Sequence, residues 1–207
     1  MLKISDFIIP DWPAPANVHS LQTTRNGGVS TGSFASLNLG NHVQDDALHV
    51  AHNRQLLSQF VPSEPVWLNQ VHGIDVIDAA NADCVAVNCI PNADASFTTR
   101  HNTVCVTMTA DCLPILLCDT AGTVVASIHA GWRSLCDGVI EATVAKILST
   151  PNLKAGHLMA WLGPAIGPSA FEVGGEVRAQ FMAKDAQAES AFQSKGNEKW
   201  LCNIYRI

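Results

Sequence analysis

Charged residues are scarce in this 207-residue chain, and no segment is strongly basic. Lys, Arg, Asp and Glu make up 14% of the residues, and the formal net charge is −6. A protein that binds a nucleic-acid backbone needs several clustered cations, so we expect no nucleic-acid partner. Hydrophobic residues reach 47%, which excludes a disordered chain. The length and composition favour a globular protein with a single domain over residues 1–207.

Long apolar runs are also missing. The most apolar stretches, residues 112–118 and 123–129, fall far short of the ~20 residues of a membrane span. The N-terminal sequence Met1-Leu-Lys-Ile-Ser-Asp6 contains no apolar signal-peptide core. We therefore expect a cytoplasmic protein without a membrane partner, present as a monomer or a weak homo-oligomer.

Paired cysteine motifs are absent as well. The seven cysteines are odd in number, and no two of them have Cys-x-x-Cys spacing. This argues against a disulfide framework and against a zinc ribbon. We expect most of them to be reduced, buried side chains. They are Cys84, Cys89, Cys105, Cys112, Cys118, Cys136 and Cys202.

Apolar periodicity and turn residues predict a mixture of strands and helices. Strands are predicted at residues 18–24, 104–109, 113–118, 123–129 and 158–162. Helical patterns cover residues 45–60, 134–148, 175–184 and 199–207. Because the two kinds of element alternate irregularly, we predict an α/β (α+β) fold of mixed β-sheets flanked by helices.

Three residues stand out because each lies where an apolar run meets a turn: His72, Cys112 and His129. The turn signal Asp119-Thr-Ala-Gly122 lies midway between the last two. In an unbulged hairpin Cys112 and His129 would be cross-strand partners, with Cβ atoms ~5 Å apart. They could then share a metal ion or act as a nucleophile and its base. Pro114 argues against a regular pairing, since proline suits an edge strand or a bulge.

The spacing of the sequence does not place His72 near the other two residues. If it joins them, two imidazoles and a thiolate form a ligand set that suits Zn²⁺. Three protein ligands leave a position open, as in catalytic zinc sites. Asp111, next to Cys112, is a candidate to orient a ligand or to act as an acid or base. The candidate catalytic residues are thus Asp111, Cys112 and His129.

Six segments, in order along residues 23–177, carry a resemblance to a known family. They are Thr23-Thr-Arg-Asn-Gly-Gly-Val-Ser30, Ala35-Ser-Leu-Asn-Leu-Gly40, Trp67-Leu-Asn-Gln-Val-His-Gly73, Thr109-Ala-Asp-Cys-Leu-Pro114, His129-Ala-Gly-Trp-Arg133, and Trp161-Leu-Gly-Pro-Ala-Ile-Gly-Pro168 with Phe171-Glu-Val-Gly174. Together they resemble the YfiH family of purine nucleoside phosphorylases, which is also catalogued as polyphenol oxidases or laccase-domain proteins. Family members usually continue for some tens of residues, so the chain looks as if it lacks the family's C-terminal segment.

The resemblance implies one zinc ion held by His72, Cys112 and His129. It implies phosphorolysis of adenosine, inosine and methylthioadenosine to the free base and a ribose 1-phosphate. It also implies deamination of adenosine to inosine. The expected partners are therefore nucleosides and phosphate. Copper is an alternative metal, because Cu²⁺ outcompetes Zn²⁺ at most nitrogen and sulfur sites.

Phosphorolysis needs cations to hold phosphate and polar groups to hold the nucleoside. Arg25 and Arg133 are candidates for the phosphate or ribose contacts. Asn38, His42 and Gln70 are candidates for polar contacts with the substrate.

Three other functions stay open. A copper-dependent, laccase-like polyphenol oxidase fits the older family label, but the eight histidines include no His-x-His pair. A hydrolase of peptidoglycan precursors would use Cys112 as nucleophile and His129 as base. A non-enzymatic metal-binding module would need a fourth protein ligand, for which Cys136 or Asp111 would have to serve.

Overall fold

The structure, a computed structural model, describes residues 2–81, 90–151 and 153–207. Its largest sheet has five strands in the order β3-β4-β6-β5-β7, with β3 parallel to β4 and the other pairs antiparallel. These strands are β3 (Val76–Asp78), β4 (Ala95–Thr98), β5 (Leu113–Asp119), β6 (Val125–Ala130) and β7 (Leu158–Leu162). The sheet is mixed, as predicted.

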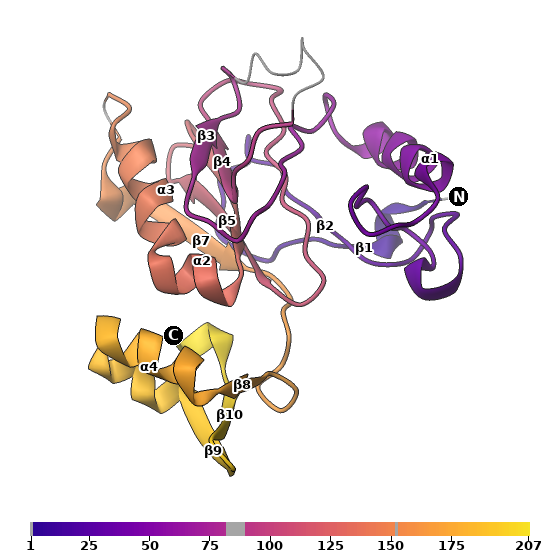
Figure 1. The fold of residues 1–207 in the computed structure, drawn as a ribbon. Coiled ribbons are helices and arrows are strands. Elements are labelled where there is room, and N and C mark those ends of the chain that lie inside the picture. The colour runs from indigo at the N-terminus through magenta and orange to yellow at the C-terminus, as the bar shows by residue number, and fades with distance from the viewer. Residues whose placement is uncertain (1, 82–89, 152) are drawn as a thin grey trace.

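Two helices pack on this sheet, α2 (Trp132–Asp137) and α3 (Val139–Leu148) (Figure 1). Val139 and Ile147 of α3 are fully buried in the core formed with the strands. The single helix predicted at 134–148 is wrong. Gly138 has a φ of +99°, a left-handed conformation that ends α2 and lets the chain start again as α3.

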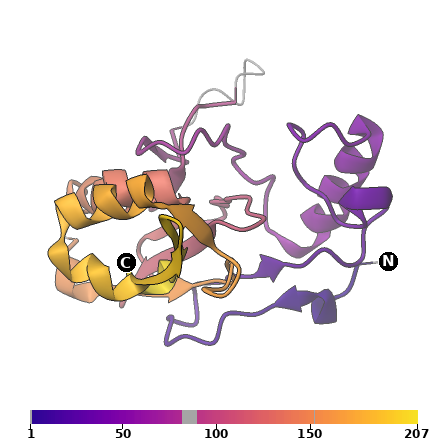
Figure 2. The ribbon, with the colours of Figure 1, turned by 60° about the horizontal axis from the view of Figure 1, so that its bottom comes forward.

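Two smaller sheets flank the central one, and they lie well apart from each other in Figures 1 and 2. Near the N-terminus are β1 (Phe7–Ile8), β2 (Gln22–Thr23) and α1 (Ala47–Leu57). Near the C-terminus are β8 (Glu172–Gly174), α4 (Gly175–Lys184), β9 (Phe192–Gly196) and β10 (Lys199–Cys202). The short 3₁₀ helices are η1 (Ile4–Asp6), η2 (Gly32–Phe34), η3 (Ser58–Phe60), η5 (Ala155–His157), η6 (Ala186–Ala191) and η7 (Ile204–Arg206). The described part of the fold thus consists of one mixed sheet and two smaller antiparallel sheets, flanked by helices.

Several predicted elements are confirmed and others are corrected. Strand β7 and helix α4 have the predicted bounds, and α1 with η3 fills most of 45–60, capped by Asp46. The strand predicted at 18–24 is reduced to β2, and 104–109 makes only an isolated bridge through Cys105. The helix predicted at 199–207 is wrong, because β10 pairs with both β8 and β9. Pairing on both sides overrides the weak local preference for a helix.

The β5–β6 hairpin exists as predicted, but its register differs by two residues. Pro114, and not Cys112, is the partner of His129. The cause is the carboxylate of Asp119, which accepts hydrogen bonds from the Thr123 and Val124 amides at 2.6 and 3.1 Å and so keeps both residues in the turn. Because side chains alternate along a strand, a two-residue shift leaves Cys112 diagonal to His129 on the same face.

Pro114 is tolerated inside the sheet, contrary to the expectation of an edge strand or a bulge. Its carbonyl accepts a hydrogen bond from the Gly163 amide at 2.9 Å, beside the first β5–β7 pair. In an antiparallel pair the proline position would return a hydrogen bond to the Gly163 carbonyl. The Tyr205 hydroxyl supplies it instead, at 2.9 Å.

The described cysteines behave largely as predicted. All five are free, and Cys118, Cys136 and Cys202 are buried. Burial raises the pKa of Cys118 and of Cys202 to about 11 each. Cys84 and Cys89 lie outside the described residues. In the part of the chain that the structure describes, no helix has the length and apolar character needed to cross a membrane.

Candidate metal centre

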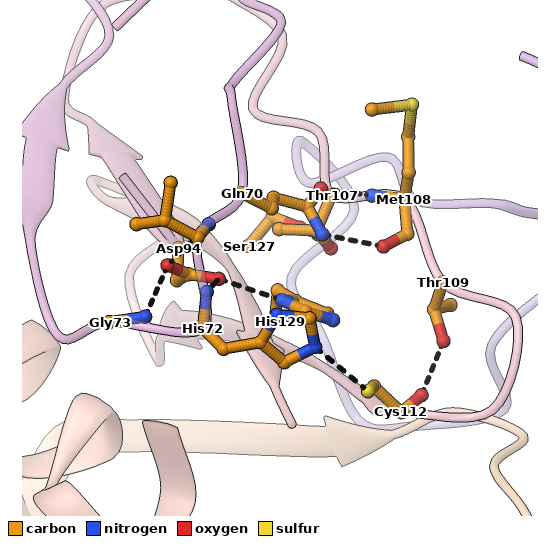
Figure 3. A network of polar contacts seen from close by, with 11 residues as sticks. Gln70, His72, Gly73, Asp94, Thr107, Met108, Thr109, Cys112, Ser127 and His129 are labelled. Carbon is orange, nitrogen blue, oxygen red and sulfur yellow. Dashed lines mark hydrogen bonds and ion pairs between the residues drawn. The ribbon is translucent and has the colours of Figure 1, made fainter. Parts of the chain in front are cut away.

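The structure brings together the three residues that the sequence singled out. His72 lies in the loop before β3, Cys112 directly precedes β5, and His129 is the penultimate residue of β6. One nitrogen or sulfur atom from each lies within 4.8 Å of the others. The Cys112 Sγ and His72 Nε2 atoms are 3.7 Å apart, and the two imidazole centroids are 4.8 Å apart in an edge-to-face arrangement (Figure 3).

This geometry fits a zinc ion. Zinc binds imidazole nitrogen and thiolate sulfur at about 2.0–2.3 Å, so tetrahedral ligand atoms lie roughly 3.3–3.6 Å apart. The His72–Cys112 distance of 3.7 Å is close to this range. His129 is only 4% exposed, whereas His72 is exposed and Cys112 half-buried, so the cluster has a buried side and an accessible side. The accessible side is where a substrate would approach.

Gly131 is what allows this close approach. A Cβ atom at this position would lie 2.5 Å from His72 Cδ2 and 3.2 Å from Cys112 Sγ. Any side chain larger than hydrogen would therefore push into the ligand cluster. The sequence analysis did not single out this glycine, since nothing in its local pattern shows what packs against it.

Asp94 lies directly against the cluster, although no motif in the sequence indicates it. It is 0% exposed and lies directly before β4. Its Oδ1 is 2.8 Å from His129 Nδ1 and accepts the His72 amide hydrogen at 3.0 Å. Its Oδ2 accepts the amide hydrogens of Val71 and Gly73 at 3.1 and 2.7 Å (Figure 3). The local sequence gives one weak signal, an aspartate between two alanines, Ala93 and Ala95.

The electrostatics of the two imidazoles differ. Burial alone would lower the pKa of His129, but its hydrogen bonds to Asp94 and Cys112 outweigh this and raise that pKa to about 9. Burial and then the neighbouring His129 lower the pKa of His72. Burial would raise the pKa of Asp94, but its hydrogen bonds to His129, Gly73 and Val71 bring the pKa below the ordinary value. His72 is thus favoured in the neutral form that a metal requires.

The cluster opens onto a cavity of about 2490 Å³. This is larger than the roughly 300–1,000 Å³ of typical ligand pockets. Five further residues predicted from the sequence also line it: Arg25, Asn38, His42, Gln70 and Asp111. Arg133 is exposed at the start of α2, where its guanidinium stacks on the Trp132 ring at 4.4 Å, and its charge contributes to the lowered pKa of His72.

Several of these predicted contact residues already hold loops of the protein. The Arg25 Nε donates to the Ala35 carbonyl at 2.8 Å. The Asn38 amide nitrogen donates to the Asp45 carboxylate at 2.9 Å, and its oxygen accepts from the Gly40 amide at 3.0 Å. These bonds shape the loop over residues 25–45 that borders the cavity.

Gln70 has a comparable role beside the cluster. Its side-chain amide donates to the Met108 carbonyl and accepts from the Met108 amide, both at 2.7 Å. The Thr109 hydroxyl in turn donates to the Cys112 carbonyl. Gln70 therefore ties the segment before His72 to the segment before Cys112 (Figure 3).

The fold and the cluster define a mixed α/β protein with three residues that could hold a metal ion at the edge of a large cavity. The family model described as "Multi-copper polyphenol oxidoreductase laccase" matches residues 19–207, and the chain belongs to this laccase-like family.

Curated relatives extend this finding. The chain is 50% identical to "Purine nucleoside phosphorylase YfiH" of Escherichia coli over 206 residues, which cover 99% of this chain and 81% of that protein. It is 48% identical to a purine nucleoside phosphorylase of Pseudomonas aeruginosa over 97% of this chain and 79% of that protein. A crystal structure of a Neisseria meningitidis protein superposes with a TM-score of 0.90 at 46% identity, covering 97% of this chain and 79% of that one.

Proposed function

We propose that this chain is a zinc-dependent purine nucleoside phosphorylase that also deaminates adenosine. The observation that carries the proposal is the cluster of His72, Cys112 and His129, which opens onto a large cavity. It is supported by the 50% identity of the chain to a protein named purine nucleoside phosphorylase. The proposed substrates are adenosine, inosine and methylthioadenosine, together with phosphate.

In phosphorolysis, a phosphate oxygen forms a bond to the ribose C1′ while the bond from C1′ to the purine nitrogen breaks. The purine leaves with the electron pair of that bond and takes up a proton, and ribose 1-phosphate remains. Two needs follow, a cationic group to hold phosphate and a proton source near the base. We assign phosphate binding to Arg133 and Arg25, and proton transfer to the exposed carboxyl of Asp111.

Polar contacts with the nucleoside are assigned to the cavity-lining residues Asn38, His42 and Gln70. Deamination replaces the purine 6-amino group with an oxygen from water and releases ammonia. His72, Cys112 and His129 would hold the zinc ion, which supplies Lewis-acid chemistry and lowers the pKa of a water molecule toward about 7.

A cysteine hydrolase is the second candidate, and one observation favours it. His129 lies between Asp94 and Cys112, with Nδ1 on the carboxylate at 2.8 Å. A nucleophilic cysteine, a histidine base and an orienting carboxylate have this arrangement in other hydrolases. The phosphorylase proposal needs the metal, whereas the hydrolase does not, so removal of the metal distinguishes them.

The oxidase reading rests on the description of the family model. Among the described residues, His72, Cys112 and His129 are the one group with metal-ligand geometry. Loading this centre with copper and assaying the oxidation of a phenol such as catechol would test the oxidase function.

The test is release of hypoxanthine from inosine by the purified, zinc-loaded chain, with and without phosphate. We expect release only with phosphate, lost in His129→Ala and after chelation, and kept in His52→Ala, which removes an exposed histidine of α1. Absence of release from the zinc-loaded protein, or release that survives His129→Ala, would contradict the proposal. Peptidoglycan-fragment hydrolysis that persists after chelation would establish the cysteine hydrolase instead.

A further inference from the structure

We propose that Asp94 is a positioning residue that holds both histidines of the metal centre in ligating geometry. It would fix the ring of His129 so that Nε2 faces the metal. It would also hold the backbone conformation that presents His72. This inference rests on the zinc centre proposed above and assigns the residue on which that centre depends.

The first contact concerns the tautomer of His129. Its Nδ1 is 2.8 Å from Asp94 Oδ1, and the two side chains are 5% and 0% exposed. A carboxylate only accepts hydrogen bonds, so Nδ1 must carry the proton. Nε2 is then the nitrogen left to bind a metal, which would displace the proton on it. A carboxylate behind a metal-binding histidine commonly fixes its tautomer and orientation in this way.

The second set of contacts concerns the backbone of His72. This residue has a φ of +58°, a left-handed conformation that is strained for an L-residue. Here the conformation lets three consecutive amides, those of Val71, His72 and Gly73, converge on one carboxylate. Such a group of amides forms an anion-binding concavity. The contacts offset the strain and leave the His72 ring 3.7 Å from Cys112 Sγ.

The two sets of contacts share one carboxylate, and all of its neighbours are donors. Oδ1 receives the His129 ring and the His72 amide, and Oδ2 receives the Val71 and Gly73 amides. An asparagine at this position would have to place its NH₂ group against one of these sets. If it faced His129, the ring proton would move to Nε2 and block ligation. If it faced the loop, the partly buried amides of Val71 and Gly73 would lose their acceptor.

Asp119 provides a matched control at the other end of the β5–β6 hairpin. It is 4% exposed, and its Oδ1 accepts from the Thr123 and Val124 amides. Its Oδ2, however, accepts from the Thr123 hydroxyl at 2.7 Å. Because a hydroxyl can also accept a hydrogen bond, Asp119→Asn can keep every contact.

The experiment compares zinc affinity in the wild type, Asp94→Asn and Asp119→Asn by competition with a chromogenic chelator. Loss of a partner behind a metal ligand typically costs 10- to 100-fold in affinity, and we expect that loss for Asp94→Asn alone. Cobalt(II) absorption gives a second readout, because a displaced histidine changes the ligand field. Thermal unfolding without metal reports the structural cost of each substitution separately.

A measurement on the wild type keeps the proposal falsifiable even if Asp94→Asn does not fold. Long-range ¹H–¹⁵N spectra of the zinc-loaded protein identify the protonated nitrogen of each histidine. We expect His129 to ligate through Nε2 and to carry its proton on Nδ1. Ligation through Nδ1 would overturn the proposal.

Three other outcomes would also overturn it: zinc affinity unchanged in Asp94→Asn, an equal loss in Asp119→Asn, or no zinc binding by the wild type. The last would also remove the zinc centre of the proposed function. The first two would leave that centre intact, so the failures of the two proposals can be told apart.

Discussion

The same kinds of residue lie at the two ends of the β5–β6 hairpin and are used differently. At the turn end, Asp119 and Gly122 hold the chain reversal, and Cys118 is buried beside it. At the open end lie Gly131 and Cys112 of the hairpin's own flanks and Asp94, which comes from the start of the neighbouring strand β4. At the turn end every partner of the carboxylate belongs to the turn itself. At the open end one partner of the carboxylate is the imidazole of His129, whose second ring nitrogen can bind a metal.

This comparison shows what separates a structural carboxylate from a functional one in this fold. Both are buried, and both accept several hydrogen bonds. The difference lies in the donor, because a hydrogen bond to an imidazole decides which of its nitrogens can ligate. The three experiments below test this difference between the two ends, from the largest expected effect to the smallest.

The largest expected difference concerns the two cysteines. The thiolate is the reactive form, and with a pKa raised to about 11 only about one Cys118 in a thousand is ionised at pH 8. Cys118 is also 0% exposed, whereas Cys112 is half-buried. We expect iodoacetamide to modify Cys112 at least a hundredfold faster than Cys118, and zinc to suppress this reaction. Peptide mass spectrometry over time measures both sites, and equal rates would contradict the assignment.

The second difference concerns the two glycines. A Cβ in Gly131→Ala would press on His72 and Cys112, so we expect zinc affinity to fall by roughly the 10- to 100-fold seen when ligand geometry is disturbed. Gly122 has a φ of +67°, and a Cβ there would lie 2.3 Å from Oδ1 of Asn17, an exposed side chain that can move aside. Gly122→Ala should therefore cost about 1–2 kcal/mol of stability for its backbone conformation and leave zinc affinity intact. Calorimetric zinc titration and urea unfolding of both variants measure this. Zinc affinity equal to wild type in Gly131→Ala would refute the steric argument.

The smallest effect is a pH dependence at the turn end. Burial would raise the pKa of Asp119, but hydrogen bonds from Thr123 and Val124 bring it below the ordinary value. A lowered pKa stabilises the fold above about pH 4, the unfolded value, and this contribution is lost as the pH falls through the folded value. Asp119→Asn should therefore cost about 1 kcal/mol at pH 7, the difference between charged and neutral hydrogen bonds.

The same variant should approach the wild type in stability as the pH falls below about 4 and then through the lowered folded pKa of Asp119, where its carboxyl becomes neutral. Urea unfolding at pH 7 and at a series of pH values below 4 provides the comparison. A difference in stability that stays constant over the whole series would show that the charge of Asp119 contributes nothing.

Local sequence patterns predicted the parts of the fold that local energetics control. Helix α4 and strand β7 have their predicted bounds, and Asp46 caps α1. The helix prediction for residues 199–207 was wrong because the conformation of β10 depends on pairing with β8 and β9 on either side. The predicted hairpin register was wrong by two residues, because the length of the turn depends on the contacts of the Asp119 side chain with Thr123 and Val124.

The sequence by itself determined the chemistry of the centre. It contains two imidazoles and a thiol, each at the end of an apolar run. Because side chains alternate along a strand, the spacing about the turn also puts Cys112 and His129 on one face of the sheet. Only the tertiary structure decided that His72 joins them, since a separation of 40 positions between His72 and Cys112 sets no distance in space. It also revealed Asp94 and Gly131, whose roles depend on neighbours distant in sequence. The role of the carboxylate and the need for a glycine both depend on the side chains that the folded chain packs against them.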